Sequence, residues 1–235
     1  MTATPATQTT ATTEGNERTE ATAVDGSTGG YEPTDRTVPS RSRDRARYDR
    51  ATVHSILDGA YICHLGFVRD GAPVVLPTLY ARVGESLYMH GSTGSRPLLA
   101  ARRTDPGLPV CVTVTHVDGL VLARSAFHHS LNYRSVVVHG TARQVTDEAE
   151  CRTALDAMVD AVAPGRSADT RPANARELAA TSVIRVDLAE VSAKIRSGPV
   201  NDEAEDLDLP GAAADPHAER RLRSPSDGPG QGGLV

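Results

Sequence analysis

The sequence predicts a mainly β protein in which antiparallel strands close into a barrel and short helices flank it. Between residues 45 and 199, six or seven short runs of β-branched and apolar residues are separated by turns that contain Gly and Asp. Few segments carry apolar residues at the spacing of three and four positions that an amphipathic helix requires. Strands linked by hairpins bury their apolar sides when the sheet closes on itself, which predicts a barrel.

Both ends of the chain differ in composition from its middle. Residues 1–44 are dominated by Thr, Ala, Glu and Gly, and residues 200–235 combine an acidic run with Pro and Gly. Such segments cannot bury enough apolar surface to offset the loss of chain entropy on folding. We therefore predict disordered tails at residues 1–44 and 200–235 around a single folded domain at residues 45–199.

The first half of the domain alternates between helices and strands. Val53, Ile56 and Leu57 fall on one face of a helix, and Gly59 follows as a stop signal. Arg69-Asp70-Gly71 has the composition of a hairpin turn. The predicted elements are a helix from about residue 49, strands at residues 61–68, 74–82 and 86–90, and a helix at residues 95–104.

The second half contains another predicted hairpin and a longer helix. Val117-Asp118-Gly119 separates two apolar runs in the manner of a turn. Apolar residues then recur at helical spacing between residues 151 and 162, which predicts a helix begun by Thr146 or Asp147. The predicted elements are strands at residues 110–116, 120–127 and 133–140, the helix from residue 146, a loop at 164–172, a helix at 175–179 and a strand at 182–188.

Composition and cysteine usage exclude several classes of protein. Aromatic residues make up only 3% of the chain and Trp is absent, so Val, Leu, Ile and Ala must build the core. The three cysteines lie far apart without a paired spacing, which argues against a disulfide framework and against a metal site. We expect free thiols in a reducing compartment. No apolar run is long enough for a signal peptide or a membrane span, so the sequence predicts a cytoplasmic protein without a membrane partner.

The charge of the chain is unevenly distributed. The net charge is −4 for residues 1–40 and −5 for residues 201–235, but +4 for the segment between them. A weakly basic middle suits an anionic ligand. Nucleic acid would require a denser basic face with aromatic side chains for stacking, so we expect no nucleic-acid partner.

Residues 88–98 form the most informative segment, because a strand leads through Gly, Ser and Thr residues into the start of a helix. A helix N-terminus offers unpaired N–H groups and partial positive charge, and Ser92, Ser95 and Arg96 add hydroxyl and guanidinium donors. The segment therefore predicts a phosphate site. The alternative is an ordinary capped turn, with Ser95 as the cap and Arg96 in solvent. The Lys and the spacing of a triphosphate-binding loop are absent.

Several motifs, in their order along the chain, resemble a known family. Gly94-Ser95-Arg96, after a strand that ends in Tyr88-Met89-His90, is similar to the phosphate-binding turn of the pyridoxamine phosphate oxidase-like FMN split barrels. The hairpin at residues 57–80 and the strand at residues 133–140 resemble the nitroimidazole-resistance-type, flavin-nucleotide-binding branch. The resemblance covers about residues 45–199.

The resemblance implies a six-stranded split barrel that pairs as a homodimer, with FMN bound between the subunits. Ser95 and Arg96 would hold the phosphate, and His90, which faces the cofactor in the family, would transfer a proton or contact the ligand. The other residues that the resemblance and the phosphate segment place at the cofactor are Val74, Val75, Pro77 and Thr78 along the ring, Ser92 in the loop, and Tyr133, Arg134 and Ser135 in the same cleft.

Two features depart from the oxidases that act on the vitamin. Those oxidases carry a Lys directly after the Ser-Arg pair, where this chain has Pro97. Relatives also commonly carry a Trp-containing segment after the run that corresponds to residues 193–199, and this chain has no Trp. Recognition of the vitamin is therefore not expected.

The resulting hypothesis is an FMN-dependent oxidoreductase that passes electrons from NADH or NADPH to a small acceptor such as a nitroaromatic or a quinone. One alternative is a non-catalytic flavin- or haem-binding sensor or storage protein, with His90 as an axial ligand. Another is a deazaflavin-dependent reductase, since one Lys against 24 Arg suggests a GC-rich genome. His90 could also be a hydrogen-bonded structural residue. The other conspicuous histidines are predicted to be structural: His64, His116 and His139 on strands, and His128 and His129 in a loop.

Overall fold

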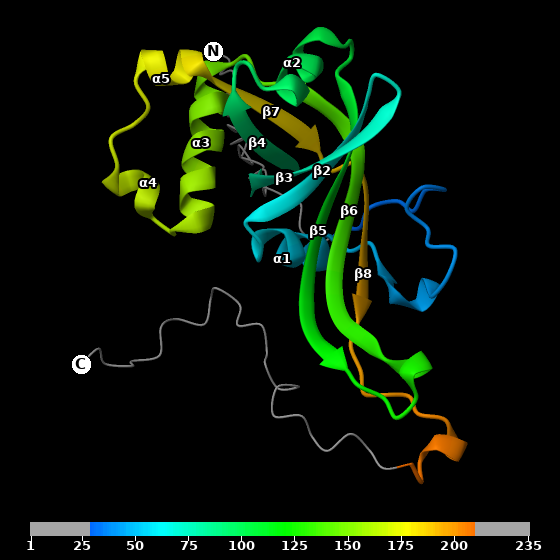
Figure 1. Ribbon diagram of the computed structural model, residues 1–235. Coiled ribbons are helices and arrows are strands. Elements are labelled where there is room, and N and C mark those ends of the chain that lie inside the picture. The colour runs from blue at the N-terminus through cyan, green and yellow to red at the C-terminus, as the bar shows by residue number, and fades with distance from the viewer. Residues whose placement is uncertain (1–28, 210–235) are drawn as a thin grey trace, which may run out of the picture.

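The computed structural model describes residues 29–209 (Figure 1). Eight strands form the sheet: β1 (Ala46–Arg47), β2 (Ile62–Arg69), β3 (Ala72–Val83), β4 (Ser86–Ser92), β5 (Leu108–Val121), β6 (Ser130–Gln144), β7 (Thr181–Asp187) and β8 (Glu190–Arg196). The α-helices are α1 (Arg50–Asp58), α2 (Arg96–Arg103), α3 (Glu148–Val162), α4 (Arg166–Asp169) and α5 (Ala175–Ala180). Single 3₁₀ turns lie at Arg43–Arg45, Ala126–His128 and Ala204–Asp206.

Six of the strands close a barrel, as predicted. The hydrogen-bonded order runs β6-β5-β2-β3-β4-β7, and the last residues of β6 also pair with β7, which completes the ring. All pairings are antiparallel. Strands β8 and β1 extend the sheet beyond β6, so one region of the sheet is a closed barrel and the other is an open, elongated layer.

The predicted second hairpin is wrong. Residues 108–121 form one continuous strand, β5, and Asp118-Gly119 lies at a register shift between Val117 and Gly119 in its pairing with β6. Gly in a strand favours a β-bulge as well as a turn, because both tolerate unusual backbone geometry. The true turn follows Val121, and the long β5–β6 hairpin projects from the barrel in Figure 1.

The sequence analysis missed the short strand β1, strand β8 and helix α4. Strand β8 alternates buried Val191 and Ala193 with the more polar Ser192 and Lys194, a short pattern that the sequence analysis did not recognise. Helix α4 is a single turn inside the segment predicted as a loop. The predicted helices at α1, α2, α3 and α5 are confirmed, and Asp49 and Asp147 cap α1 and α3 through hydrogen bonds to backbone N–H groups.

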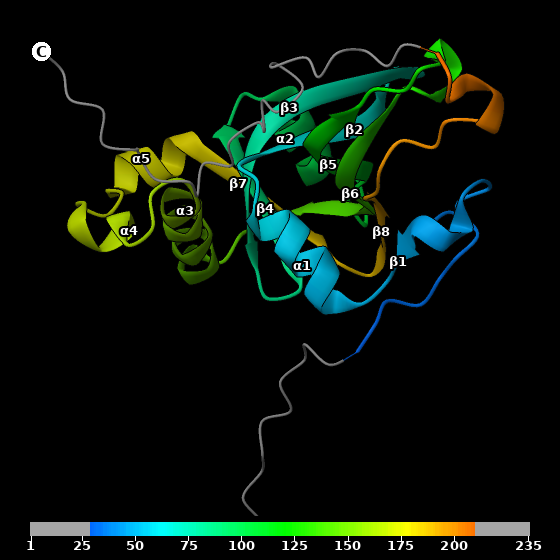
Figure 2. The ribbon, with the colours of Figure 1, turned by 90° about the horizontal axis from the view of Figure 1, so that it is seen from below.

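The barrel is filled by the aliphatic side chains that the composition predicts. Val53, Ile56 and Leu57 of α1 are buried, and Figure 2 shows this helix lying across one end of the barrel. Cys63 is buried within the same core, and burial raises the pKa of its thiol to about 12, so it behaves as a small neutral side chain. A second cluster joins Met158 and Ala154 of α3 to the outer side of β3, β4 and β7.

Part of each predicted tail packs against the domain. The Tyr31 ring is buried, and its hydroxyl lies 2.9 Å from the carboxylate of Glu85 and 3.1 Å from Nε2 of His54. At the other end, the Asp202 carboxylate accepts from the backbone N–H and the guanidinium of Arg124, at 2.9 and 2.7 Å. Residues 29–44 and 200–209 are therefore anchored to the domain, whereas residues 1–28 and 210–235 lie outside the described part.

Residues 29–209 contain neither a helix that could span a membrane nor a cluster of metal-binding side chains. None of the helices there has both the length and the apolar character that crossing a bilayer demands. Within the same residues, no three His, Cys, Asp or Glu side chains gather as a metal ion would require.

Candidate functional site

A small cavity lies where β3 and β4 of the barrel meet the start of α2. It has a volume of about 170 Å³. Four of the predicted site residues line it: Pro77 and Thr78 from β3, His90 from β4, and Ser95 at the start of α2. Its apolar walls are Leu65, Leu76, Met89, Pro97, Leu98 and Ile184.

Close packing at Gly91 places α2 against the end of β4. A Cβ at this position would lie 2.7 Å from Cδ1 of Leu98, so the glycine makes room for this buried leucine. Leu98 and Ala101 are the buried residues of α2, and they fix the helix on the barrel. The helix therefore begins at the mouth of the cavity because of how its apolar side is packed.

The start of α2 has unused hydrogen-bonding capacity. Ser95 is the N-cap residue, yet its side chain makes no capping bond, and no acidic residue lies in the first turn. Arg96 makes no ion pair or side-chain hydrogen bond with any residue in the range 29–209. An exposed guanidinium, a free hydroxyl and a helix N-terminus suit a phosphate group, which is the chemistry predicted from the sequence.

His90 has a defined ring orientation. Its Nδ1 lies 3.0 Å from the sulfur of Met158, and a thioether can only accept a hydrogen bond. The contact therefore favours the tautomer with hydrogen on Nδ1, which leaves the lone pair of Nε2 available to a ligand or a proton. This contact suits both interpretations of His90, a hydrogen-bonded structural residue and a residue that offers Nε2 to a ligand.

The other predicted site residues are more dispersed. Val74 and Val75 precede the cavity on β3, and Ser92 is exposed at the end of β4. Tyr133, Arg134 and Ser135 lie on β6 and do not line the cavity of their own chain.

Two of these β6 side chains already have partners. Arg134 grips the Asp118 carboxylate with contacts of 2.9 to 3.2 Å. The Ser135 hydroxyl donates to the carbonyl of Lys194 at 3.3 Å.

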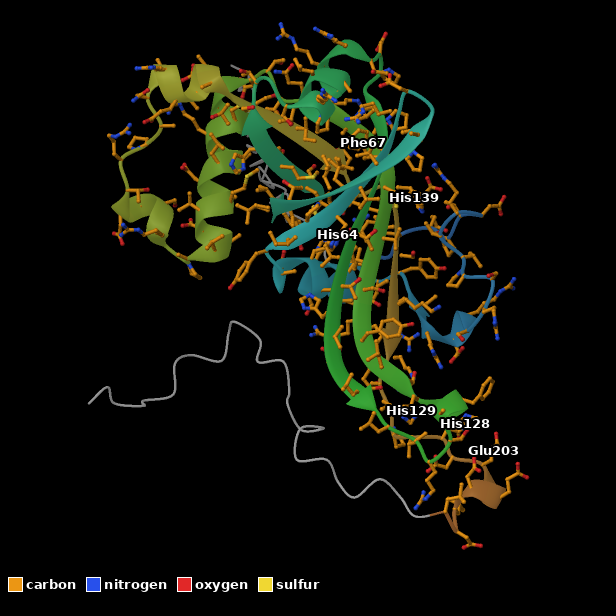
Figure 3. The ribbon with its side chains drawn as sticks, viewed as in Figure 1. His64, Phe67, His128, His129, His139 and Glu203 are labelled. Carbon is orange, nitrogen blue, oxygen red and sulfur yellow. The ribbon has the colours of Figure 1, made fainter. Side chains whose placement is uncertain are left out.

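Figure 3 shows histidines in two further settings. His64 lies on β2 with its side chain on the outer face of the sheet, and His139 lies on β6, which is separated from β2 by β5. His128, His129 and Glu203 lie at the far end of the β5–β6 hairpin, where Nε2 of His128 is 3.5 Å from the Glu203 carboxylate. The sequence analysis read all these histidines as structural, and no motif around them indicated otherwise.

The exposed setting of His64 is distinctive. Its neighbours across the sheet on the same face are Pro77 and Thr113, and the next row contains Gly66 and Cys111. These are small side chains, so the face around the imidazole is shallow and nearly uncharged. Such a face can accept a flat molecule or another sheet.

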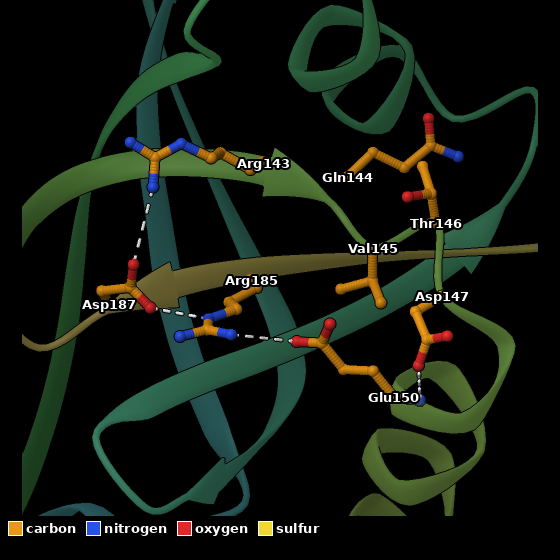
Figure 4. Close-up of a pocket in the computed structure, with 8 residues that line it drawn as sticks. All are labelled: Arg143, Gln144, Val145, Thr146, Asp147, Glu150, Arg185 and Asp187. Atoms are coloured by element: carbon orange, nitrogen blue, oxygen red, sulfur yellow. Dashed lines mark hydrogen bonds and ion pairs between the residues drawn. The ribbon is translucent and has the colours of Figure 1, made fainter.

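A charged hollow of about 380 Å³ lies between the end of β6, the start of α3 and the end of β7 (Figure 4). Asp187 accepts from Arg185 at 2.6 Å and lies 3.5 Å from Arg143, and Arg185 reaches Glu150 at 3.2 Å. The Tyr88 hydroxyl donates to the same Glu150 at 2.8 Å. Arg143, Arg185, Glu150 and Asp187 thus already have partners of opposite sign, and Asp147 is engaged in capping α3, so the hollow offers no free cation for an anionic ligand within residues 29–209.

The third space is a larger, mostly apolar cavity of about 630 Å³, bounded by α3, α4, α5 and the edge of the barrel. His90 lines it as well as the small cavity at α2. The side chain with the strongest sequence signal for function therefore stands between two spaces.

Comparison with known proteins agrees with the fold described above. Residues 49–195 match the family described as pyridoxamine 5'-phosphate oxidase. The chain belongs to this family. No curated protein matches the sequence.

Two solved structures are similar in both sequence and fold. The flavocytochrome Anf3 from Azotobacter vinelandii is 40% identical, with a TM-score of 0.70, over 77% of this chain and 83% of that one. The FAD and haem binding protein from Mycobacterium smegmatis is 38% identical, with a TM-score of 0.67, over 72% and 81% of the two chains.

A third structure shares the fold alone. It is assigned to 5-nitroimidazole antibiotic resistance in Bacteroides thetaiotaomicron and is 21% identical, with a TM-score of 0.52, over 64% of this chain and 86% of that one. The predicted flavin-binding split-barrel family is therefore confirmed.

Proposed function

We propose that this protein is a flavin- and haem-binding redox protein that accepts electrons from NADH or NADPH and passes them to a small acceptor. The observation that carries the proposal is the identity of 40% and 38% to two structures, one named a flavocytochrome and the other an FAD and haem binding protein. Fold alone would not carry it, because one fold hosts many functions. Similarity at this level over about three quarters of the chain supports shared cofactors.

The cavity at α2 supports a flavin site. Ser95 and Arg96 would bind a phosphate, which FMN and FAD both contain, and Pro77 and Thr78 would lie along the ring system. His90 would present Nε2 to the ring or to a substrate proton. When bound, the flavin supplies hydride and electron transfer chemistry, and the protein supplies binding and orientation. The sequence favoured FMN, and the M. smegmatis relative named for FAD makes FAD an equal candidate.

A homodimer would complete this site. The cavity of about 170 Å³ is smaller than the roughly 300 to 1,000 Å³ typical of cofactor pockets, so one chain provides only part of the walls. Next to it, Ile62, Val68 and Val75 on β2 and β3 are 48%, 64% and 63% exposed. We propose that a second copy covers this apolar face and contributes the missing walls.

A haem would need an axial ligand, for which an imidazole is one common choice, and apolar surroundings for its macrocycle. His64 meets both conditions on the outer face of the sheet, and a second copy packed there would bury it. His90 is the other candidate, because its Nε2 is unengaged. When bound, haem supplies one-electron chemistry.

The first test is an absorption spectrum of the purified protein, before and after denaturation releases the bound groups. We expect flavin bands together with a Soret band, and chromatography of the released flavin distinguishes FMN, FAD and a deazaflavin. A protein that carries neither chromophore, even after reconstitution with both, would contradict the proposal. Oxidation of NADH or NADPH with a nitroaromatic or quinone acceptor then tests the activity.

Histidine variants locate the haem. We expect His64→Ala to abolish the Soret band and His90→Ala to leave it, with His139→Ala as the control on the same sheet face. Loss of the band in His90→Ala alone would move the haem to His90 and would contradict the assignment to His64.

A further inference from the structure

We infer that the cavity of about 630 Å³ beside α3 is a binding site for a flat, uncharged aromatic molecule that carries carbonyl or nitro oxygens. The inference deepens the proposed function, because it rests on His90 being part of the flavin site as well as of this cavity. It assigns a position in the molecule to the electron acceptor, for which the proposed function names no binding site.

The walls of the cavity are aliphatic. They consist chiefly of Leu79 from β3 and Leu155, Met158, Val159 and Val162 from α3. Val159 and Val162 are 38% and 51% exposed, although α3 buries Ala154 and Met158 against the barrel. A helix that exposes a second apolar side over a cavity of ligand size is typical of a small-molecule site.

Specific polar contacts join the outer wall of the cavity to the two ends of α3. Helix α4, the segment at residues 170–174 and α5 form an arch, which Figure 1 shows standing off from α3. The Asp160 carboxylate accepts from the backbone N–H and the hydroxyl of Ser167, at 2.8 and 2.7 Å. Arg152 donates to the carbonyl of Ala173 at 3.0 Å.

The two anchors, one at each end of α3, are tied to different parts of the arch. Asn174 and Glu177 add a reciprocal capping box that orders the start of α5. These contacts keep the arch in place without filling the space beneath it, which is the behaviour of a pocket already formed before its ligand arrives.

The charges around the cavity favour an uncharged ligand. Arg171 is neutralised by a two-point contact with Glu177. The remaining charged side chains of the lining are Arg166 and Asp156, one of each sign, and neither forms an ion pair within residues 29–209. A carbonyl or nitro oxygen can accept from Arg166, and the apolar walls can cover an aromatic ring, whereas a strongly ionic molecule would be desolvated against aliphatic walls at a net cost.

The test uses the full-length protein and the fluorescence of a bound aromatic probe, excited at wavelengths longer than those that Tyr and Trp absorb. The probe is N-phenyl-1-naphthylamine, an uncharged aromatic molecule, and menadione and nitrobenzene are titrated separately as competitors. We expect saturable binding of the probe and displacement by at least one competitor. Displacement of the probe at a lower concentration of menadione would identify a carbonyl compound as the preferred ligand, and displacement at a lower concentration of nitrobenzene would identify a nitro compound.

Two variants locate the binding. Val159→Trp fills the cavity from a partly exposed position, and Val162→Asp places a charge in it. Each is expected to weaken probe binding by at least about tenfold, which corresponds to about 1.4 kcal/mol. Leu131→Trp, at a side chain of comparable exposure (41%) on the β5–β6 hairpin, is the matched control and should bind like the unmodified protein.

Unchanged probe binding in both cavity variants would overturn the inference. Loss of the Soret band in Val159→Trp would also overturn it, because the cavity would then hold the haem. A protein without flavin or haem that still binds the probe at this cavity would contradict the proposed function and leave the site itself standing, so the two failures are distinguishable.

Discussion

The two cavities that meet at His90 are built from opposite kinds of material. On the α2 side, the Ser95 hydroxyl lines a narrow space, and the next residue, Arg96, is exposed and has no ion pair within residues 29–209. On the α3 side, aliphatic side chains face a space more than three times as large, and two of its four charged side chains, Arg171 and Glu177, are paired with each other. The first is suited to an anionic group and the second to an apolar ring, so His90 stands where two different ligand chemistries could meet.

The two cavities also differ in how they are attached to the barrel. Helix α2 is anchored by two buried side chains, whereas α4 and α5 bury none. The arch therefore depends on polar contacts that water can replace, and the α2 cavity depends on core packing. We expect the arch to be more mobile than α2, because local stability follows the amount of buried apolar contact.

The largest expected effect is the loss of stability when Met158, which contacts the residue shared by the two cavities, is substituted. Met158 is buried against the outer side of the barrel and also touches His90. Met158→Ala should lower the free energy of unfolding by about 2 to 5 kcal/mol, since it removes most of a buried side chain. Met158→Leu should cost less than about 1.5 kcal/mol, because it keeps the volume. Urea denaturation measures both.

The leucine variant separates packing from hydrogen bonding. It fills the wall but has no acceptor for the Nδ1–H of His90, so the ¹⁵N chemical shifts of that ring should report a loss of the preferred tautomer while the fold is retained. Identical ring spectra in the two proteins would show that the sulfur does not orient His90.

The next prediction concerns only flavin binding at the proposed phosphate site at the start of α2. Arg96→Ala should weaken flavin binding by about 10- to 100-fold, because charge-assisted hydrogen bonds contribute about 1.5 to 3 kcal/mol each. Arg102→Ala, in the last turn of the same helix, is the control. Titration with FMN and FAD gives the affinities, and fluorescence of the naphthylamine probe checks that the larger cavity is unaffected. Full retention of flavin by the Arg96 variant would remove the phosphate assignment.

Sequence reasoning predicted the barrel, which the structure confirms, and a phosphate site at the start of α2, which stays a prediction. It did not indicate the apolar cavity beside α3. Helix periodicity around Val53 and Ile56 and the turn at Gly94-Ser95-Arg96 are local signals, and local signals carry most of the structural information in a single sequence. The continuity of β5 through Asp118-Gly119 depended on pairing with β6, which no local pattern reveals.

The larger cavity is a tertiary feature in the same sense. Residues that the sequence predicted simply as a loop become its outer wall only through the contacts of Asp160 and Arg152. Tyr31 likewise belongs to the core although its surroundings in the sequence are polar and small, because its partners lie on α1 and beyond β3. Single anchoring side chains of this kind leave no periodic trace.

The smallest effect tests whether the arch is held by charge. The hydrogen bonds that Glu177 accepts from Arg171, and next from the backbone N–H of Asn174, lower the pKa of its carboxyl from 4.5 to about 2. Because the folded-state pKa is the lower one, this contribution to stability is complete above pH 4.5 and disappears as the pH falls through 2. The protection of α5 amides against hydrogen exchange, relative to the intrinsic rate at each pH, should therefore decrease over that interval, whereas α2, which has no acidic residue in its first turn, should not respond in the same way. A ¹³C titration of the Glu177 carboxyl gives the midpoint directly, and Arg171→Gln should return it toward 4.5; a midpoint already near 4.5 in the unmodified protein would show that this ion pair does not hold the arch in solution.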